Sequence, residues 1–220
     1  MRKLLQGIVE FREQKILEYR EKYADLALGQ APDSLFVACS DSRVVPNLFA
    51  STNPGDLFVI RNMGNLIPPC AQNGLSVGDE SEAAAIEFAL YSLHVSDIII
   101  CGHSECGAMR ALCNGRENIR ALNMSSWLQH GEDALKALKE NKDFSPHLTE
   151  HNRLSQINVL KQLEHMASYP VVKERLAQKK VRLHGWWFDL ATADVYLYEQ
   201  ESKKFVLIDA KQVEKMLPQT

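Results

Sequence analysis

The sequence predicts an α/β fold, a single domain with a mainly parallel central sheet flanked by helices. Three short apolar runs, at 34–38, 56–62 and 96–102, are rich in β-branched or aromatic residues, and polar or turn-forming residues bound them, as is typical of buried strands. Between the second and third runs, 78–93 begins with acidic residues and continues with apolar residues at helical spacing. A strand, a helix and a strand in this order form a crossover unit, which joins parallel strands.

The segments on either side of this unit complete the predicted fold. Residues 1–28 place apolar residues at near-helical spacing between charged ones, which predicts an N-terminal arm of one or two amphipathic helices. The arm either packs on a neighbouring subunit or covers its own core. Helices are expected near 121–141 and 149–178, a fourth strand within 180–190, and short strands around 195–199 and 204–208 that end the sheet with an antiparallel edge. No repeat or linker divides the chain, so one domain is expected over 1–220.

Composition and charge exclude several classes of partner. The chain has 220 residues, of which 45% are hydrophobic and 24% charged, and these are ordinary values for a globular protein. Its net charge is −3 and its basic residues are interleaved with acidic ones, so neither nucleic acid nor an anionic membrane is an expected partner. The apolar runs are much shorter than the roughly 20 residues of a membrane helix, and the charged start is unlike a signal peptide. A cytoplasmic location is therefore expected.

The five cysteines are too few for a disulfide framework, and their number is odd. Reduced thiols are expected instead, and in that setting a cysteine cluster more often binds a metal or takes part in catalysis. Cys70, Cys101 and Cys113 are each expected to be structural, because an isolated cysteine in an apolar segment behaves as a small core residue. Cys39 and Cys106 remain as candidates for chemistry.

Two of the predicted strands end in residues that bind metals. Cys39 directly follows the first run, and the third run ends in "CGHSECG" at 101–107. Ligands bind at the carboxyl ends of open parallel sheets, so Cys39, His103 and Cys106 are expected to share one point, with Gly102 making the turn and the last two residues on the opening turn of a helix. Two cysteines and one histidine suit tetrahedral zinc and leave a fourth position for water, which becomes hydroxide near neutral pH. One zinc ion per subunit is expected.

Asp41 and Arg43 follow Cys39 at alternating positions, so the three side chains can point to one side. Arg43 would then hold the Asp41 carboxylate by two parallel hydrogen bonds and leave one oxygen to accept a hydrogen bond from the zinc water. The same grip would keep Asp41 from becoming a fourth zinc ligand that closes the site. A plain ion pair is the ordinary alternative, and "HSEC" alone is a weak metal signal, but the two segments together favour a catalytic site.

These segments resemble the β-class carbonic anhydrases, in particular their plant-like and bacterial branch. The similarity rests on "CSDSR" (39–43) and "CGHSECG" (101–107), with support from "PGDLFVIRNMGN" (54–65) and "HGWWFD" (184–189), and it covers most of the chain between Gln30 and Asp189. The resemblance implies a zinc lyase that converts carbon dioxide reversibly to bicarbonate and a proton. It implies that Cys39, His103 and Cys106 hold the zinc and that Asp41 and Arg43 are the catalytic pair.

The resemblance also implies a substrate pocket. Gln30 matches a position whose side-chain amide binds a substrate oxygen, and Gly107 matches one whose backbone N–H does so. Phe58, Met63 and Phe88 match apolar positions that line a narrow slot, which suits uncharged carbon dioxide. The ordinary alternative for these three is core packing, and for Met63 the two interpretations are evenly balanced. In the family the pocket is shared across a subunit interface, so a dimer or a higher even oligomer is implied.

One difference from some bacterial members concerns regulation. Those members carry a bicarbonate site built from Trp, Arg and Tyr, and the matching positions here are Phe36, Arg61 and Phe188. The indole N–H and the phenol hydroxyl are both missing. The expectation is an open, water-bearing zinc that bicarbonate does not inhibit by this route. None of the histidines besides His103 is a clear proton shuttle.

Two other functions remain open at this point. The same zinc hydroxide could hydrolyse carbonyl sulfide or carbon disulfide, which the shape of the pocket would decide. The chain could instead be a non-catalytic zinc protein that serves assembly. Asp41, Arg43 and Gln30 argue against that alternative, because a structural zinc site needs none of them.

Overall fold

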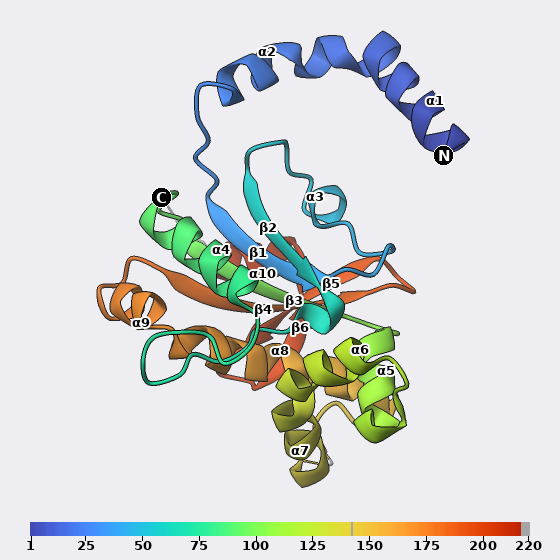
Figure 1. Ribbon diagram of the computed structural model, residues 1–220, viewed down its shortest axis with the longest axis vertical. Coiled ribbons are helices and arrows are strands. Elements are labelled where there is room, and N and C mark those ends of the chain that lie inside the picture. The colour runs from blue at the N-terminus through green and yellow to red at the C-terminus, as the bar shows by residue number, and fades with distance from the viewer. Residues whose placement is uncertain (142, 217–220) are drawn as a thin grey trace.

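The structure is a computed structural model that describes residues 1–141 and 143–216. Its centre is a six-stranded sheet with the order β2-β1-β3-β4-β5-β6 (Figure 1). The strands are β1 (Ser34–Cys39), β2 (Leu57–Asn62), β3 (Asp97–His103), β4 (Arg182–Asp189), β5 (Asp194–Glu199) and β6 (Lys204–Leu207). The first four are mutually parallel, β5 is antiparallel to β4, and β6 is antiparallel to β5. The predicted fold class is thereby confirmed, with antiparallel pairing at the C-terminal edge.

Helices surround this sheet and extend from it at the N-terminus. In chain order they are α1 (Arg2–Glu10), a π-helical turn (Phe11–Lys15), α2 (Ile16–Leu26), α3 (Pro46–Phe49), α4 (Glu80–Tyr91), α5 (Gly107–Cys113), α6 (Leu122–Trp127), α7 (Glu132–Glu140), α8 (Glu150–Ser168), α9 (Pro170–Ala177) and α10 (Ala210–Met216). Short 3₁₀ turns occupy Met63–Asn65, Arg116–Asn118 and Leu128–Gly131. The predicted helix near 121–141 is thus two helices joined by a 3₁₀ turn, and the one near 149–178 is broken at Pro170.

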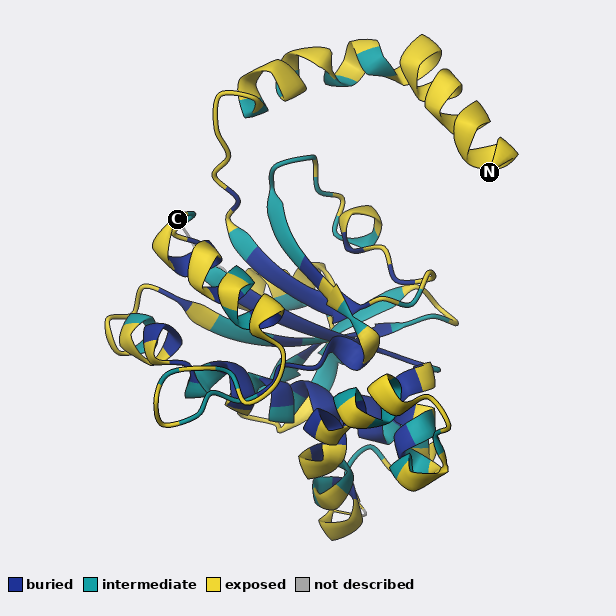
Figure 2. Cartoon of the chain, in the orientation of Figure 1, coloured by how far each residue is buried: buried dark blue, intermediate teal, exposed yellow. Residues whose placement is uncertain are grey.

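Alternation along the central strands places side chains in two different apolar clusters. Leu35 and Val37 of β1 pack with residues of α4, α8 and α9 on one face of the sheet. Phe36 and Ala38 point to the other face, where they pack in a cluster that includes Phe188. Both faces of β1 are therefore buried (Figure 2), which explains why its sequence is a continuous apolar run instead of an alternating one.

A third apolar cluster lies where the strands end. It contains buried residues of α5, α7 and α8, and it also contains Cys39 and Cys106. The clusters on the sheet faces therefore hold the strands in register, while the third cluster surrounds the carboxyl ends of β1 and β3. Any group bound by these cysteines is shielded from bulk water.

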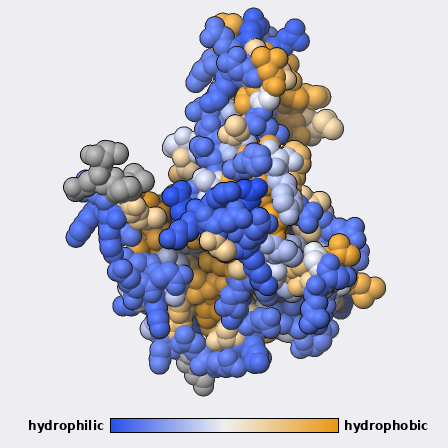
Figure 3. Space-filling view, turned by 90° about the vertical axis from the view of Figure 1, so that its left-hand side faces the viewer, coloured by the Kyte–Doolittle hydropathy of each residue, from blue (hydrophilic) through white to orange (hydrophobic). Residues whose placement is uncertain are grey.

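The N-terminal arm, α1 and α2, extends away from the body of the molecule (Figure 1). No residue of either helix is buried, and Leu4, Leu5, Ile8 and Val9 are all more than half exposed. Figure 3 shows apolar surface gathered on one side of the projecting arm at the top of the view. The alternative in which the arm covers its own core is therefore not what the structure shows. An apolar helix face of this kind is favourable only when another surface covers it.

None of the helices within residues 1–141 and 143–216 is both long enough and apolar enough to cross a membrane.

Candidate metal centre

Three predicted ligands lie at the carboxyl ends of two neighbouring strands. Cys39 is the last residue of β1, His103 is the last residue of β3, and Cys106 directly precedes α5. Because β1 and β3 are parallel neighbours, their ends meet at one edge of the sheet. His103 and Cys106 therefore come from a strand end and a helix cap, and the predicted placement of both on the first turn of a helix is wrong.

The turn between these two ligands also differs from the prediction. Gly102 lies inside β3 and pairs with Trp187, so it does not make the turn. A Cβ atom at Gly102 would lie 2.8 Å from Cγ2 of Val159, so glycine is required here for α8 to approach the strand. Ser104 and Glu105 make the turn, and Glu105 adopts a left-handed conformation with φ of 56°.

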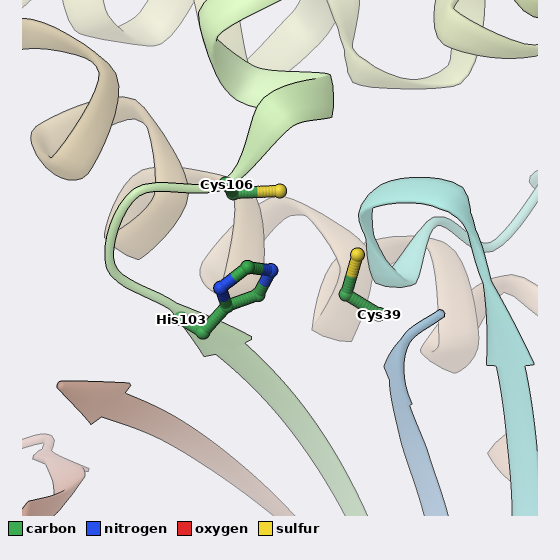
Figure 4. Close-up of side chains that lie close together, drawn as sticks. All are labelled: Cys39, His103 and Cys106. Atoms are coloured by element: carbon green, nitrogen blue, oxygen red, sulfur yellow. The ribbon is translucent and has the colours of Figure 1, made fainter. Parts of the chain in front are cut away.

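The ligand atoms of Cys39, His103 and Cys106 all lie within 4.8 Å of one another. Figure 4 shows the two sulfur atoms and the imidazole ring facing a common space. All three residues are buried, with exposed fractions of 2%, 0% and 0%. One metal ion placed between them could contact all three side chains.

The hydrogen bonding of His103 tests whether a metal fits this space. Nδ1 lies 2.8 Å from the carbonyl oxygen of Ser104, which can only accept, so Nδ1 carries the proton and Nε2 has a free lone pair. Nε2 is buried and has no hydrogen-bond partner among the described residues. A buried acceptor left unpaired costs about 1–3 kcal/mol. The donor set of one imidazole nitrogen and two sulfurs therefore fits a metal, and its chemistry suits zinc.

The two thiols influence each other strongly. The pKa of Cys39 is lowered, chiefly by its hydrogen bond with Cys106 and further by contacts with His103 and the Gly64 N–H, which lies 3.3 Å from Cys39 Sγ. The pKa of Cys106 is raised by the same interaction with Cys39 and by burial. This interaction favours ionisation of Cys39 beside a protonated Cys106, and a bound metal cation would displace the remaining proton.

Asp41 and Arg43 form a bidentate pair just beyond β1. Nε of Arg43 donates to Oδ1 of Asp41 at 2.9 Å, and Nη2 donates to Oδ2 at 2.7 Å. The backbone N–H of Arg43 also donates to Oδ1 at 3.0 Å. These hydrogen bonds hold the pKa of Asp41 well below its usual range. Nη2 additionally donates to the Glu105 carbonyl at 3.2 Å, so Arg43 joins the Asp41 segment to the segment that carries Cys106.

Arg61 contacts the same segment from β2, a contact that the sequence motifs do not predict. Its Nε and Nη2 donate to the carbonyl oxygen of Cys39 at 3.0 and 2.7 Å, and Nη2 donates to that of Asp41 at 2.8 Å. Phe36 and Phe188, which match the same regulatory site of some bacterial members as Arg61 does, are buried in an aromatic cluster around Phe49. This contact could have been inferred from the parallel pairing of β1 with β2, because that pairing places Arg61 beside Ala38, the residue before Cys39.

The predicted substrate residues fall into two groups. Met63 directly follows β2, and Gly107 begins α5 beside Cys106, so both lie near the metal centre. Phe58 pairs with Leu35 near the other end of the strands, four residues before Asn62, the partner of Cys39. At about 3.3 Å per residue this places Phe58 roughly 13 Å from the ligand edge.

Phe88 and Gln30 belong to the distant group. The ring of Phe88 packs on that of Phe58 with centroids 5.7 Å apart. Gln30 precedes β1 and lines an open hollow of about 440 Å³ between α2 and the turn at Pro54. Within one chain the structure therefore brings Met63 and Gly107 to the metal centre, but not Gln30, Phe58 or Phe88.

Comparison with known proteins identifies similar chains. The family model described as carbonic anhydrase matches residues 34–195. A carbonic anhydrase of Helicobacter pylori strain J99 is 36% identical over 92% of both chains, and one of Pseudomonas aeruginosa is 36% identical over 94% of this chain and 91% of its own.

Solved structures of similar proteins agree with this result. The structure of the β-carbonic anhydrase CcaA has a TM-score of 0.86 and 36% identity, and the match covers 96% of this chain and 93% of that one. A structure described under tetrameric β-carbonic anhydrases from Sordaria macrospora has a TM-score of 0.73 and 27% identity, and the match covers 89% and 95%.

Proposed function

This chain belongs to the β-carbonic anhydrase family and is a carbonic anhydrase, and on that premise we propose that it hydrates carbon dioxide reversibly with one zinc ion held by Cys39, His103 and Cys106. The observation that carries the proposal is the buried cluster of two sulfurs and one unpartnered imidazole nitrogen. Zinc bound at such a site makes water a nucleophile near neutral pH. The remaining chemistry depends on the residues around it.

Asp41 orients the reacting water in this proposal. Oδ1 of Asp41 accepts from both Nε and the backbone N–H of Arg43, whereas Oδ2 accepts only from Nη2 and retains a lone pair that can accept a hydrogen bond from water. Because the pKa of Asp41 is well below its usual range, the group stays ionised throughout the physiological pH range and cannot retain the proton that the reaction releases. Asp41 is therefore an acceptor that fixes the direction of the water, and the proton leaves through another group.

Arg43 keeps the site open. Its bidentate contact occupies Asp41 and opposes movement of the carboxylate toward the ligand cluster, and its contact with the Glu105 carbonyl keeps the guanidinium group in place. Arg61 holds the carbonyl groups of Cys39 and Asp41 from the other side. We therefore propose that the fourth ligand position belongs to water and not to Asp41.

The substrate pocket is completed by a second subunit. Met63 and Gly107 lie beside the metal centre of their own chain, while Gln30, Phe58 and Phe88 lie near the opposite end of the strands. A two-fold related copy would bring this second group to the metal centre of the first. The uncovered apolar face of the arm and the tetrameric description of a similar structure support self-association.

Mixed oligomers provide a test of this shared pocket. Asp41→Asn and Gln30→Ala subunits are each expected to hydrate carbon dioxide poorly alone. When the two are co-expressed, random pairing gives hybrid dimers with one intact site, so activity should recover to about a quarter of the wild-type value per chain. Stopped-flow hydration of the purified mixture measures this recovery. A mixture that shows only the mean of its two parents would mean that each chain serves its own metal.

The surroundings of the enzyme are inferred from its thiols. The five cysteines form no disulfide in the described part of the chain. Free thiols persist in a reducing compartment, and we propose the cytoplasm.

Metal analysis combined with hydration kinetics tests the proposed function directly. The purified protein should contain about one zinc per chain, lose activity after treatment with a chelator, and regain it when zinc is added back. Zinc should be measured by elemental analysis and hydration by stopped flow with a pH indicator. Full hydration activity in the metal-free protein would refute the proposal, and so would stoichiometric zinc without hydration.

A further inference from the structure

One face of α8 carries a row of buried polar residues at steps of three or four positions. All of them are at least nine-tenths buried: Asn152, Ser155, Asn158, Gln162 and His165. Buried amides and hydroxyls destabilise a fold unless they are hydrogen-bonded, so a polar row on the inner face of a helix requires partners inside the protein. None of these residues belongs to the ligand cluster.

The partners of this row are backbone groups in the two loops that surround the metal centre. Ser155 Oγ donates to the His103 carbonyl at 2.7 Å, and Gln162 Oε1 accepts from the Ile67 N–H at 2.7 Å. His165 Nδ1 donates to the Ile67 carbonyl at 2.8 Å. Helix α8 is therefore connected to the loop after β3 and to the loop after β2.

Asn158 connects α8 to a group that touches a metal ligand. Its Nδ2 donates to the carbonyl oxygen of Gly64 at 3.0 Å, and the N–H of the same glycine donates to Cys39 Sγ at 3.3 Å. Gly64 has a left-handed φ of 79°, and an added Cβ would lie 3.0 Å from Cβ of Ala108. The direction of the Gly64 N–H therefore depends on a backbone conformation that few other residues could adopt.

The orientation of the Asn158 amide is determined by its neighbours. Gln162 accepts from the Ile67 N–H through Oε1, so its Nε2 must face the other way, where it donates to Oδ1 of Asn158 at 3.0 Å. Oδ1 is thereby an acceptor for Gln162, and Nδ2 is the atom that faces Gly64. Asn158 is fully buried, so this hydrogen bond is enclosed by protein.

Asn152 makes comparable hydrogen bonds to the loop after β3. Its Oδ1 accepts from the Glu105 N–H at 2.7 Å, and its Nδ2 donates to Oε1 of Glu105 at 3.1 Å. Glu105 is the left-handed residue directly before Cys106, and its carbonyl oxygen accepts from Arg43. The Asn152 amide therefore holds the residue that precedes Cys106, and the same residue provides the carbonyl oxygen that anchors the Asp41–Arg43 pair.

We propose that Asn152 and Asn158 are positioning residues of the metal centre, Asn158 by directing the Gly64 N–H at the Cys39 sulfur and Asn152 by holding Glu105 between Cys106 and Arg43. Neither residue touches the metal or the substrate. The inference rests on the proposed zinc site, but it assigns the geometry of that site to a helix that supplies no ligand. Outer hydrogen-bond partners of metal ligands commonly change metal affinity or activity by about 10–100-fold.

The test compares Asn158→Ala and Asn152→Ala with a matched control, Gln156→Ala. Gln156 is also a buried amide on α8, with 4% exposure, but it bonds the Ser145 hydroxyl at 2.7 Å, in a loop that supplies no ligand. Zinc affinity is measured by competition with a chromophoric chelator, and hydration is measured per bound zinc. Both test variants should bind zinc about 10–100-fold more weakly than wild type, while the control variant keeps wild-type affinity.

A spectroscopic readout separates positioning from general loss of stability. In cobalt-substituted Asn158→Ala, loss of the hydrogen bond to Cys39 should move the sulfur-to-cobalt charge-transfer band to longer wavelength, while Gln156→Ala leaves the band unchanged. If Asn158→Ala does not fold, Asn152→Ala carries the affinity test, because Asn152 lies closer to the surface.

Three results would overturn the inference: wild-type zinc affinity in the test variants, an equal loss of affinity in Gln156→Ala, or an unshifted band in folded Asn158→Ala. Failure of the wild-type protein itself to bind zinc would instead refute the proposed function.

Discussion

Cys106→Ser is expected to release the zinc and to reduce hydration to the background rate. A serine hydroxyl is not ionised at neutral pH and is a poor ligand for zinc, so the two remaining ligands, Cys39 and His103, would have to hold the ion alone. Because this change removes a ligand, its effect should exceed the 10–100-fold typical of outer partners and reach at least the order of 10³-fold in activity. Elemental analysis and stopped-flow hydration on the same preparation measure the two losses.

Cys101→Ser is the matched control for this substitution. Cys101 is fully buried in β3, two residues before His103, but it lies outside the ligand cluster and packs in the apolar cluster that contains Phe36 and Phe188. Burial raises the pKa of its thiol far above the usual value, so it has no tendency to ionise. The control should lower thermal stability but keep one zinc per chain. Retention of zinc by Cys106→Ser, or its loss from Cys101→Ser, would contradict the assigned ligand set.

The sequence was sufficient to predict the sheet edge at which the site lies. Runs of β-branched residues define β1 and β3 to within about one residue, and in a parallel sheet the residues that follow such runs share an edge. Cys39, His103 and Cys106 could be grouped for this reason without any knowledge of side-chain geometry. The alternation of Asp41 and Arg43 likewise predicted the two parallel hydrogen bonds between them.

The contacts that hold this edge together could not be predicted in the same way. Asn158 and Gly64 are 94 residues apart in the chain, and the atom that Asn158 binds is a backbone carbonyl, which every residue possesses. Polar residues within a helical pattern are ordinarily expected to face solvent. Those of α8 face inward because they pair with backbone groups of the adjacent loops that would otherwise have no hydrogen-bond partner. Gly102 was mistaken for a turn residue because a glycine after an apolar run has the same local signature in either role.

Asp41→Asn is expected to reduce hydration severely while zinc remains bound. In the native pair, Nη2 of Arg43 donates to Oδ2 of Asp41, and Nε and the backbone N–H donate to Oδ1. An asparagine side chain has only one carbonyl oxygen, and its NH₂ group cannot accept a hydrogen bond. In either orientation the NH₂ group faces an Arg43 donor, so the hydrogen bonds at that atom are lost. The reacting water then loses a fixed acceptor, and kcat/KM should fall by about 10²–10³-fold, the range for loss of one preorganised hydrogen-bond group.

The pH dependence of the wild-type enzyme provides a second check on the role of Asp41. A carboxyl group whose pKa is lowered is ionised at every pH above that value, so its contribution is fully present at neutral pH and is lost only in strong acid. Protonation of Asp41 should therefore cause no fall in the hydration rate at or above the ordinary aspartate pKa of about 3.9. A wild-type activity limb between about pH 5 and pH 8 that disappears in Asp41→Asn would show that Asp41 instead exchanges the proton.

Asp97→Asn distinguishes loss of the water acceptor from loss of an ion pair. Asp97 accepts from Nε and Nη2 of Arg182 at 2.8 and 2.7 Å, which is nearly the same geometry as in the Asp41–Arg43 pair, but at the amino end of β3. Its pKa is lowered to about 2 although its burial opposes this shift, so the group is charged in the native state and the substitution should destabilise the fold. Hydration per bound zinc should nevertheless remain at the wild-type level. If Asp97→Asn lost activity as severely as Asp41→Asn, the effect would be due to stability, and Asp41 would have no special role toward water.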